Sequence, residues 1–218
     1  MEYTIRMKQL EKKVVVYDID ECLVNSVKSH YLLLLLWMEQ HGHTRKPSYA
    51  QFCAGGGTKP FEDLWPEYHQ YCEENRMSSS FNGSLEEVPG ARAAQLTLTT
   101  LSYAYLTTRP DDMEQETLEQ LKRLEFLQLL LVTRPHAVPI SATPDWKRAE
   151  LQKMASTTQT PKLLLDDNLP TYEAVKDAKD PGIDAILIAG DRTPKVPAAK
   201  EWADVPHAIR TYLQKARL

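Results

Sequence analysis

Four acidic side chains follow two hydrophobic runs of the chain, at the points where buried strands would end. Asp18 and Asp20 come after the apolar run 14–17, and Asp166 and Asp167 come after the leucines at 163–165. In parallel sheets, ligands bind beyond the carboxyl ends of the strands. Carboxylates gathered at such an edge form an oxygen-rich site of the kind that holds Mg²⁺ together with a phosphate group. Acids are also common at solvated strand ends, and neither pair is decisive by itself.

Hydrogen-bond donors for phosphate oxygens occur at comparable places. Thr107 follows the run 101–106, and Lys147 lies in a predicted helix at 145–154. Thr108 and Arg109 continue the first of these stretches, and an arginine can bind phosphate through two parallel hydrogen bonds. Arg109 can equally be an exposed residue before a helix that starts at Pro110. Together with the acids, these residues predict a site for phosphate and Mg²⁺.

Strand and helix patterns alternate through the second half of the chain. Predicted strands lie at 101–106, 127–132, 162–165 and 185–188, and predicted helices at 110–124, 145–154, 172–178 and 205–216. This alternation is typical of the α/β class, with a Rossmann-like parallel sheet that has helices on both faces. The strand at 14–17 is expected to join the same sheet, which would bring the acids and the donors to one edge.

The part of the chain before residue 88 differs in character from the alternating part and has mainly helical patterns after the first strand. Ser26 can cap a helix at 25–41, and the segment 77–84 is a predicted loop. His41 and His43 could contact a metal ion. A histidine and Gly42 at the end of a helix are the more common meaning of this pattern.

Composition limits the classes of function. The 218 residues are 42% hydrophobic and 26% charged, as in soluble globular proteins, and the net charge of -4 provides no basic surface for bulk nucleic-acid binding. The first thirteen residues are too charged for a signal peptide. No apolar run approaches the ~20 residues that span a bilayer. Three cysteines without a CxxC pair are typical of a reducing compartment. We therefore expect a cytoplasmic protein that does not bind membranes.

The motifs in combination resemble those of the haloacid dehalogenase (HAD) superfamily, in its phosphatase-type form. Asp18-Ile19-Asp20-Glu21-Cys22-Leu23 resembles the DxDx[TV]L signature, with Cys22 in the place of Thr or Val, and Leu106-Thr107-Thr108-Arg109 resembles the second motif. Lys147 resembles the lysine of the third motif, and Leu165-Asp166-Asp167 resembles the acidic fourth. The resemblance covers the core. It implies an HAD-like fold in which 26–87 is a small helical cap of the C1 type, inserted into a core made of 1–25 and 88–218.

The resemblance also implies a reaction. Asp18 would attack phosphorus and form an aspartyl-phosphate. Asp20 would protonate the leaving group and then deprotonate water. Thr107 would bind the phosphoryl group and Lys147 would orient Asp18.

The same resemblance implies a magnesium site and a substrate. The protein ligands of Mg²⁺ would be Asp18, the backbone carbonyl of Asp20 and Asp167, with Asp166 close by. The expected substrate is a small phosphate monoester, bound by Thr108, Arg109 and, from a glycine-rich loop, Lys59.

Other functions remain open at this point. A phosphomutase or phosphotransferase of the same superfamily would use the same residues, and an inactive HAD-fold binding module would have lost at least one of them. The segment from Cys53 to Lys59 resembles the CX5R loop of cysteine phosphatases. That loop ends in arginine because its planar guanidinium grips phosphate, and lysine is no equivalent. A metal-dependent phosphatase is therefore the main expectation.

Overall fold

The computed structural model describes residues 13–44, 46–53, 65–75, 85–188, 198–199 and 201–215, and in it the chain divides into two units. The first unit comprises Met1–Leu23 and Glu87–Leu218, and the second comprises Val24–Glu86. The sequence analysis places the insertion at 26–87. Between the units the chain runs through two short strands, β2 (Val24–Asn25) and β3 (Glu86–Glu87), which pair with each other.

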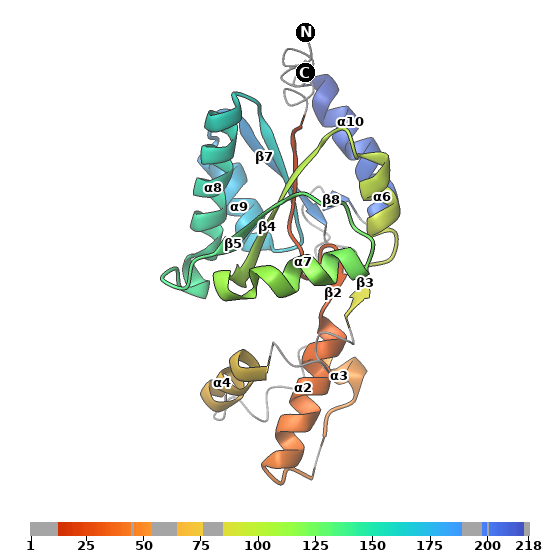
Figure 1. Ribbon diagram of the computed structural model, residues 1–218, viewed down its shortest axis with the longest axis vertical. Helices are drawn as coiled ribbons and strands as arrows, with labels where there is room; N and C mark the ends of the chain where they lie inside the picture. The colour runs from red at the N-terminus through yellow and green to blue at the C-terminus, as the bar shows by residue number, and fades with distance from the viewer. Residues whose placement is uncertain are drawn as a thin grey trace. The chain divides into compact units, whose positions relative to one another are not determined.

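The first unit is built on a parallel sheet with the strand order β5-β4-β1-β6-β7-β8 (Figure 1). The strands are β1 (Val15–Tyr17), β4 (Ser102–Pro110), β5 (Leu130–Arg134), β6 (Lys162–Asp166), β7 (Ile183–Ile188) and β8 (Ala198–Ala199). The central strand β1 lies between β4 and β6, which carry the second and fourth motifs. The sheet therefore brings together stretches that are far apart in the sequence.

Helices connect the strands, as right-handed crossovers between parallel strands require. They are α6 (Ala91–Thr97), α7 (Glu114–Arg123), α8 (Thr143–Thr158), α9 (Leu169–Ala178) and α10 (Val205–Lys215), with the short 3₁₀ helices η2 (Asp111–Met113), η3 (Ile140–Ala142) and η4 (Trp202–Asp204). Figure 1 shows α8 and α9 on one face of the sheet and α6 and α10 on the other. The predicted α/β class is confirmed.

Successive residues of β1 pack against opposite faces, as the alternation of side chains along a strand requires. Val16 belongs to a buried cluster with Leu164 of β6 and Leu151 of α8. On the other face, the ring of Tyr17 stacks on Trp202 with centroids 6.3 Å apart. The Tyr17 hydroxyl is hydrogen-bonded to Ser102 Oγ at 2.7 Å. Both faces of the strand are thus buried, and its carboxyl end is fixed in place.

The second unit is helical within the residues described. Its helices are α2 (Val27–Gln40), α3 (Tyr49–Cys53) and α4 (Trp65–Asn75). Trp37 of α2 is buried against Tyr68 of α4, with ring centroids 5.6 Å apart. The Tyr68 hydroxyl donates a hydrogen bond to the His30 carbonyl at 3.2 Å. No helix in the described residues has the length and hydrophobicity to cross a membrane.

The start of α2 differs from the sequence expectation, and its end agrees with it. Ser26 occupies the N-cap position, but its side chain makes no capping hydrogen bond, since its backbone has helical angles (φ -95, ψ -12) rather than the extended ones that a cap requires. The prediction of a serine cap is wrong. At the other end, the rings of His41 and His43 lie 4.7 and 5.4 Å from that of Trp37, and Gly42 has a positive φ of 71°. This is the helix-end arrangement that the sequence favours.

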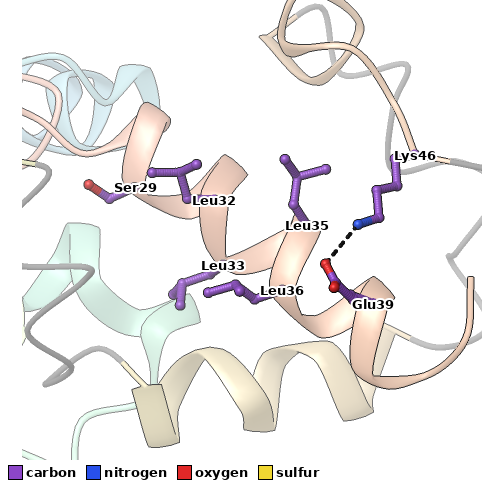
Figure 2. A pocket seen from close by; sticks show the side chains of 7 residues that line it. All are labelled: Ser29, Leu32, Leu33, Leu35, Leu36, Glu39 and Lys46. Atoms are coloured by element: carbon purple, nitrogen blue, oxygen red, sulfur yellow. Dashed lines mark hydrogen bonds and ion pairs between the residues drawn. The ribbon is translucent and has the colours of Figure 1, made fainter.

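A hollow of about 320 Å³ lies along α2 in the second unit (Figure 2). Its lining is mainly apolar and comprises Ser29, Leu32, Leu33, Leu35, Leu36, Glu39 and Lys46. The Lys46 ammonium lies 3.0 Å from Glu39 Oε2. Leu32 and Leu36 are 40% and 43% exposed. The hollow is thus part of the apolar surface of the helical unit, and none of the motif residues lines it.

Candidate active site

The acidic site begins where β1 ends beside β6. The Asp18 amide donates a hydrogen bond to the Leu165 carbonyl at 2.9 Å, and this extends the pairing of the two strands to their last residues. The Asp18 and Asp166 side chains are both buried. One carboxylate oxygen from each of Asp18, Asp166 and Asp167 lies within 4.8 Å of the others. The structure therefore brings together the acids that the sequence places at two strand ends.

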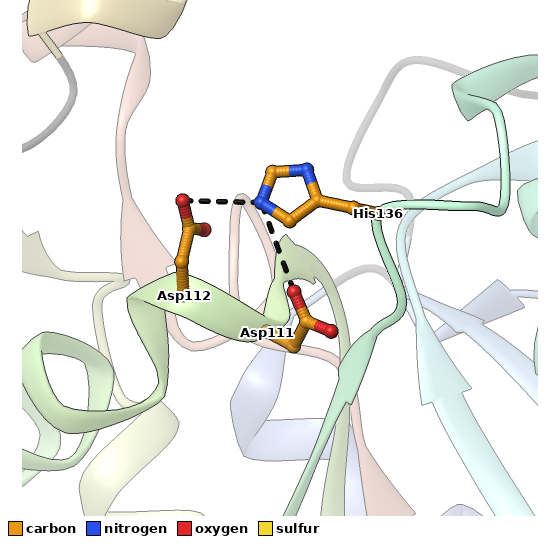
Figure 3. A group of neighbouring side chains, drawn as sticks. All are labelled: Asp111, Asp112 and His136. Carbon is orange, nitrogen blue, oxygen red and sulfur yellow. Dashed lines mark ion pairs between the residues drawn. The ribbon is translucent and has the colours of Figure 1, made fainter.

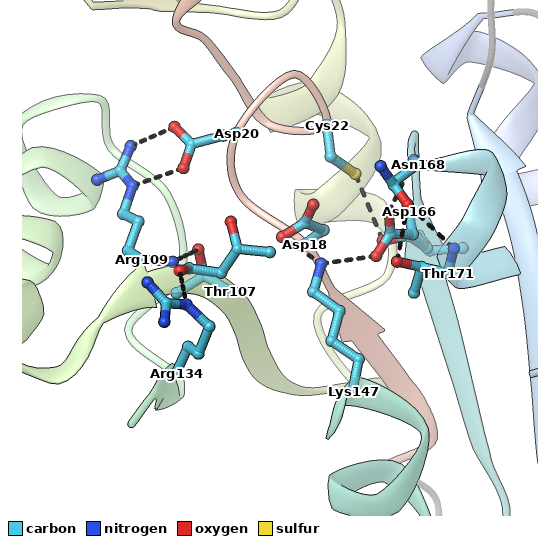
Figure 4. A network of polar contacts seen from close by, with 12 residues as sticks. Asp18, Asp20, Cys22, Thr107, Arg109, Arg134, Lys147, Asp166, Asn168 and Thr171 are labelled. Atoms are coloured by element: carbon cyan, nitrogen blue, oxygen red, sulfur yellow. Dashed lines mark hydrogen bonds and ion pairs between the residues drawn. The ribbon is translucent and has the colours of Figure 1, made fainter. Parts of the chain in front are cut away.

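Lys147 reaches this cluster from α8 and is fully buried. Its Nζ lies 2.9 Å from Asp18 Oδ1 and 2.7 Å from Asp166 Oδ2 (Figure 4). Burial by itself lowers the pKa of Lys147, but the charges of Asp166 and Asp18 outweigh it and raise the pKa above its usual value. Lys147 is thus a permanent cation between two carboxylates.

The cluster has three carboxyl groups and Lys147 supplies one positive charge. Burial raises the pKa of Asp18 well above its usual value, against the opposing effect of Lys147. Burial also raises the pKa of Asp167 to about 7, and the charges of Asp166 and Glu21 add to this. Asp18 Oδ1 is a buried oxygen that meets the Lys147 ammonium at 2.9 Å. A buried, electron-rich oxygen set of this kind suits a hard divalent cation.

Asp166 and Asp167 differ in how the protein uses them. Asp166 is bound on both oxygens, Oδ2 by Lys147 and Oδ1 by the Asn168 amide at 2.8 Å. Asp167 is partly exposed. Asn168 also caps α9, because its Oδ1 accepts a hydrogen bond from the Thr171 amide at 3.0 Å. Sequence reasoning missed Asn168, although an asparagine two residues before Pro170 is a recognisable helix-start signal.

Asp20 is held by Arg109, and the two form a bidentate ion pair. Arg109 Nε lies 2.8 Å from Asp20 Oδ2, and its NH2 group lies 2.7 Å from Oδ1. In Figure 4 the Asp20 carboxylate faces Arg109 rather than Asp18. Arg109 is buried on β4, which contradicts its reading as an exposed residue. The assignment of Arg109 to substrate binding stays a prediction.

Thr107 and Thr108 lie on β4, which runs through to Pro110 instead of ending at Leu106 as the sequence predicts. Thr107 is fully buried, and its Oγ1 accepts a hydrogen bond from the Arg109 amide at 3.3 Å. It lies two residues beyond Tyr105, whose register partner is Tyr17, the residue before Asp18. The Thr108 carbonyl accepts a hydrogen bond from Arg134 Nε at 2.9 Å. Arg134 lies in Thr133-Arg134-Pro135, which repeats the sequence of Thr108-Arg109-Pro110, and the sequence analysis gives it no role.

The turn after Asp18 is shaped by Glu21 and Cys22. Glu21 has a positive φ of 58°, and the Leu23 amide donates to the Ile19 carbonyl at 2.8 Å, which closes the turn. Cys22 is buried, and burial raises the pKa of its thiol well above the usual value. Its carbonyl accepts a hydrogen bond from Trp202 Nε1 at 2.7 Å. Cys22 therefore acts as a packing residue in the place of Thr or Val.

The remaining candidate residues of the sequence are Cys53, Lys59 and the glycines between them. Lys59 and the glycine loop at 55–57 lie outside the described residues. Cys53 ends the helix α3. The cysteine-phosphatase reading gains no support from the described part of the chain.

A second group of possible metal ligands is exposed on the first unit. His136 Nε2 lies 3.1 Å from Asp112 Oδ2 and 3.7 Å from Asp111 Oδ1 (Figure 3). The two aspartates form the first turn of η2, where acidic side chains are favoured by the free amides of a helix start. Because all three are exposed, we regard the buried acids as the stronger metal site.

Known structures share this fold. A HAD-superfamily hydrolase of subfamily IA, variant 1, from Geobacter sulfurreducens PCA aligns with 90% of this chain and 96% of its own, at 15% identity and a TM-score of 0.61. A HAD-hydrolase from Bacillus subtilis described as bound to magnesium aligns with 92% of this chain and 99% of its own, at 12% identity and a TM-score of 0.62.

A third structure, described as a predicted phosphoglycolate phosphatase from Haemophilus somnus 129PT, aligns with 91% of this chain and 98% of its own, at 15% identity and a TM-score of 0.55. No protein-family model and no curated protein matches the sequence. The structural likeness nevertheless spans both units. The chain therefore has the fold of the haloacid dehalogenase superfamily, with Asp18, Lys147 and Asp166 of the resembling motifs in one buried cluster.

Proposed function

We propose that this protein is a Mg²⁺-dependent phosphatase that hydrolyses a small phosphate monoester through an aspartyl-phosphate on Asp18. The observation that supports this most is the contact of Lys147 Nζ with both Asp18, at 2.9 Å, and Asp166, at 2.7 Å, inside a group of three buried or partly buried acids. The Bacillus subtilis protein that shares the fold is described as bound to magnesium. The phosphatase description of the Haemophilus somnus protein points to the same chemistry.

Asp18 is suited to the role of nucleophile. Its carboxylate is buried beside the Lys147 ammonium, 2.9 Å from Oδ1, and the residue is held at a strand end by the hydrogen bond from its amide to Leu165. Lys147 fixes the orientation of Asp18 and offsets its charge. In the first step an Asp18 oxygen bonds to phosphorus as the bond to the leaving oxygen breaks, and Asp20 gives that oxygen a proton.

The second step returns the enzyme to its first state. Asp20, now a carboxylate, takes a proton from water, whose oxygen bonds to phosphorus as the bond to Asp18 breaks. We assign to Thr107, which is buried two residues beyond the partner of Tyr17, a hydrogen bond to the phosphoryl group. The products are an alcohol and inorganic phosphate.

Asp18 and Asp167, with the backbone carbonyl of Asp20, would hold the magnesium ion. Asp166 has both oxygens engaged by Lys147 and Asn168, and we assign it the task of positioning Lys147. When bound, Mg²⁺ would supply charge neutralisation for the phosphoryl oxygens. The close approach of one carboxylate oxygen from each of Asp18, Asp166 and Asp167 supports this assignment.

A phosphate-release assay tests the proposal. The purified protein is given 4-nitrophenyl phosphate and a panel of small phosphorylated metabolites, phosphoglycolate included, first with a chelator and then with Mg²⁺. We expect Mg²⁺-dependent release of inorganic phosphate from the wild type and none from Asp18→Asn. Transfer of phosphate within the substrate without release would favour a mutase. Absence of release from every compound would favour a binding module.

A further inference from the structure

Arg109 engages Asp20 in a geometry that fixes the plane of the carboxylate. The two parallel contacts, of 2.8 Å from Nε and 2.7 Å from the NH2 group, use one edge of the guanidinium and both carboxylate oxygens. The side chain of Asp20 is 29% exposed, whereas the side chain of Arg109 is only 5% exposed. The buried partner is thus rigid, and it determines where the more exposed one points.

The opposite side of the guanidinium is anchored to α7. Its NH1 group donates to Gln120 Oε1 at 2.5 Å and to Thr117 Oγ1 at 3.3 Å. Both acceptors are buried. A guanidinium has five N–H donors, and four of those of Arg109 already have acceptors in the described part of the chain. A bidentate grip on phosphate would therefore require Arg109 to release Asp20.

We propose that Arg109 is a positioning residue, clamped by Gln120 and Thr117 of α7, that orients Asp20 for proton transfer and does not bind the substrate phosphate. The proposal rests on the proposed function, in which Asp20 exchanges a proton with the leaving group and with water. General acid catalysis contributes about 10²–10⁴-fold to a rate and depends strictly on the placement of the acid. A guanidinium fork is the side chain best able to hold a carboxylate in one plane.

Arg134 provides a matched control within the same protein. It occupies the same position in a second Thr-Arg-Pro, at the end of the neighbouring strand β5, and it is 6% exposed against 5% for Arg109. Its guanidinium donates to the backbone carbonyls of Thr108 and Val138 instead of to Asp20. Loss of Arg134 should therefore disturb packing at a similar depth without changing the orientation of the acid.

The test compares two substrates of similar shape that differ in their need for an acid. The 4-nitrophenolate group leaves phosphorus without protonation, whereas phenolate is a poorer leaving group that benefits from a proton. Phenol release is measured in a single turnover, with excess enzyme and saturating Mg²⁺, for wild type, Arg109→Lys, Gln120→Met and Arg134→Lys. We expect Arg109→Lys to lower the rate for phenyl phosphate about tenfold more than that for 4-nitrophenyl phosphate. Gln120→Met should change the ratio in the same direction and by less, and Arg134→Lys should leave the ratio unchanged.

Binding of inorganic phosphate, measured by calorimetry, supplies a readout independent of turnover. A positioning role predicts that Arg109→Lys and Gln120→Met bind phosphate as the wild type does. Weakening of about tenfold or more in Arg109→Lys would show a phosphate ligand and overturn the proposal. The positioning role would also be overturned if Arg109→Lys and Gln120→Met lowered the single-turnover rates of the two substrates equally. Failure of the wild type to release either phenol would instead defeat the proposed function, and the inference with it.

Discussion

Lys147 Nζ lies 2.9 Å from Asp18 Oδ1, and both side chains are buried, with exposures of 0% and 7%. The sheet places Asp18 at the end of β1, and α8 carries Lys147 to it from the far part of the chain. A buried charge is costly unless it is paired. Asp18, Lys147 and Asp166 therefore depend on one another for stability as well as for chemistry.

The Lys147→Met variant should unfold more readily than the wild type. Removal of one partner from a buried charge group leaves the others uncompensated, which costs about 3–5 kcal/mol. The matched control is Lys176→Met, which removes an ion pair with Asp184 of 2.6 Å in the same unit, where the lysine is 39% exposed. Exposed pairs contribute about 0–1 kcal/mol. Urea unfolding measures both; equal losses in the two variants would mean that Lys147 is not needed to neutralise the acids.

Addition of Mg²⁺ to the metal-free protein should raise its unfolding temperature. Binding to the folded state alone adds about 2.7 kcal/mol at a hundred times the dissociation constant. Asp167→Asn should abolish most of this stabilisation. Asp112→Asn removes an acid from the exposed group around His136 and should leave the stabilisation unchanged. Thermal unfolding with and without Mg²⁺ measures this stabilisation. If Asp112→Asn lost it and Asp167→Asn kept it, the metal site would lie at the exposed group.

Lys162 should make stability rise with pH in the alkaline range. It is buried on β6, where Nζ donates to Thr158 Oγ1 at 2.7 Å, the Thr160 carbonyl at 3.0 Å and the Lys13 carbonyl at 3.1 Å. Burial nevertheless lowers the pKa of Lys162 from 10.5 to about 8. Between these values the unfolded chain keeps a proton that the folded protein has lost, and stability therefore increases with pH.

The matching measurement is the free energy of unfolding of wild type and Lys162→Met at several pH values from 7 to 10. The difference between the two proteins should change in favour of the wild type as the pH rises through 8. A difference that stays constant, or changes in favour of Lys162→Met, would mean that the oxygen acceptors keep Lys162 charged in the folded state.

The alternation of strands and helices in the core and the convergence of the acids could be predicted from the sequence, because buried runs that end in Asp18 and Asp166 are local signals. The start of β5 could not. The apolar run begins at Leu127, but β5 begins at Leu130. The Leu127 amide donates to Gln95 Oε1 at 2.9 Å, and its carbonyl accepts from the Tyr105 hydroxyl at 2.6 Å. Side chains from other elements thus take the backbone groups that a strand would use.

The Asp20–Arg109 ion pair was also beyond the sequence analysis. Asp20 follows the end of β1 and Arg109 lies on the neighbouring strand β4, and their pairing depends on the register of β1 against β4 and on the anchor that α7 provides. A sequence shows that both charges exist but not which partner each one faces. For that reason the sequence leaves open whether Arg109 binds substrate or is exposed, and the partners of its guanidinium, Asp20, Thr117 and Gln120, are known only from the structure.

The most direct test of the catalytic assignment is phosphate release by wild type, Asp18→Asn and Cys53→Ser with one good substrate at saturating Mg²⁺. Asp18→Asn keeps the shape of the side chain but removes the nucleophilic charge. Phosphate release by this variant should fall to background, while circular dichroism should show that the protein stays folded. Cys53→Ser changes a residue at the end of α3 and should retain the wild-type rate. Activity in Asp18→Asn together with an inactive Cys53→Ser would contradict the assignment of the first strand as the catalytic centre.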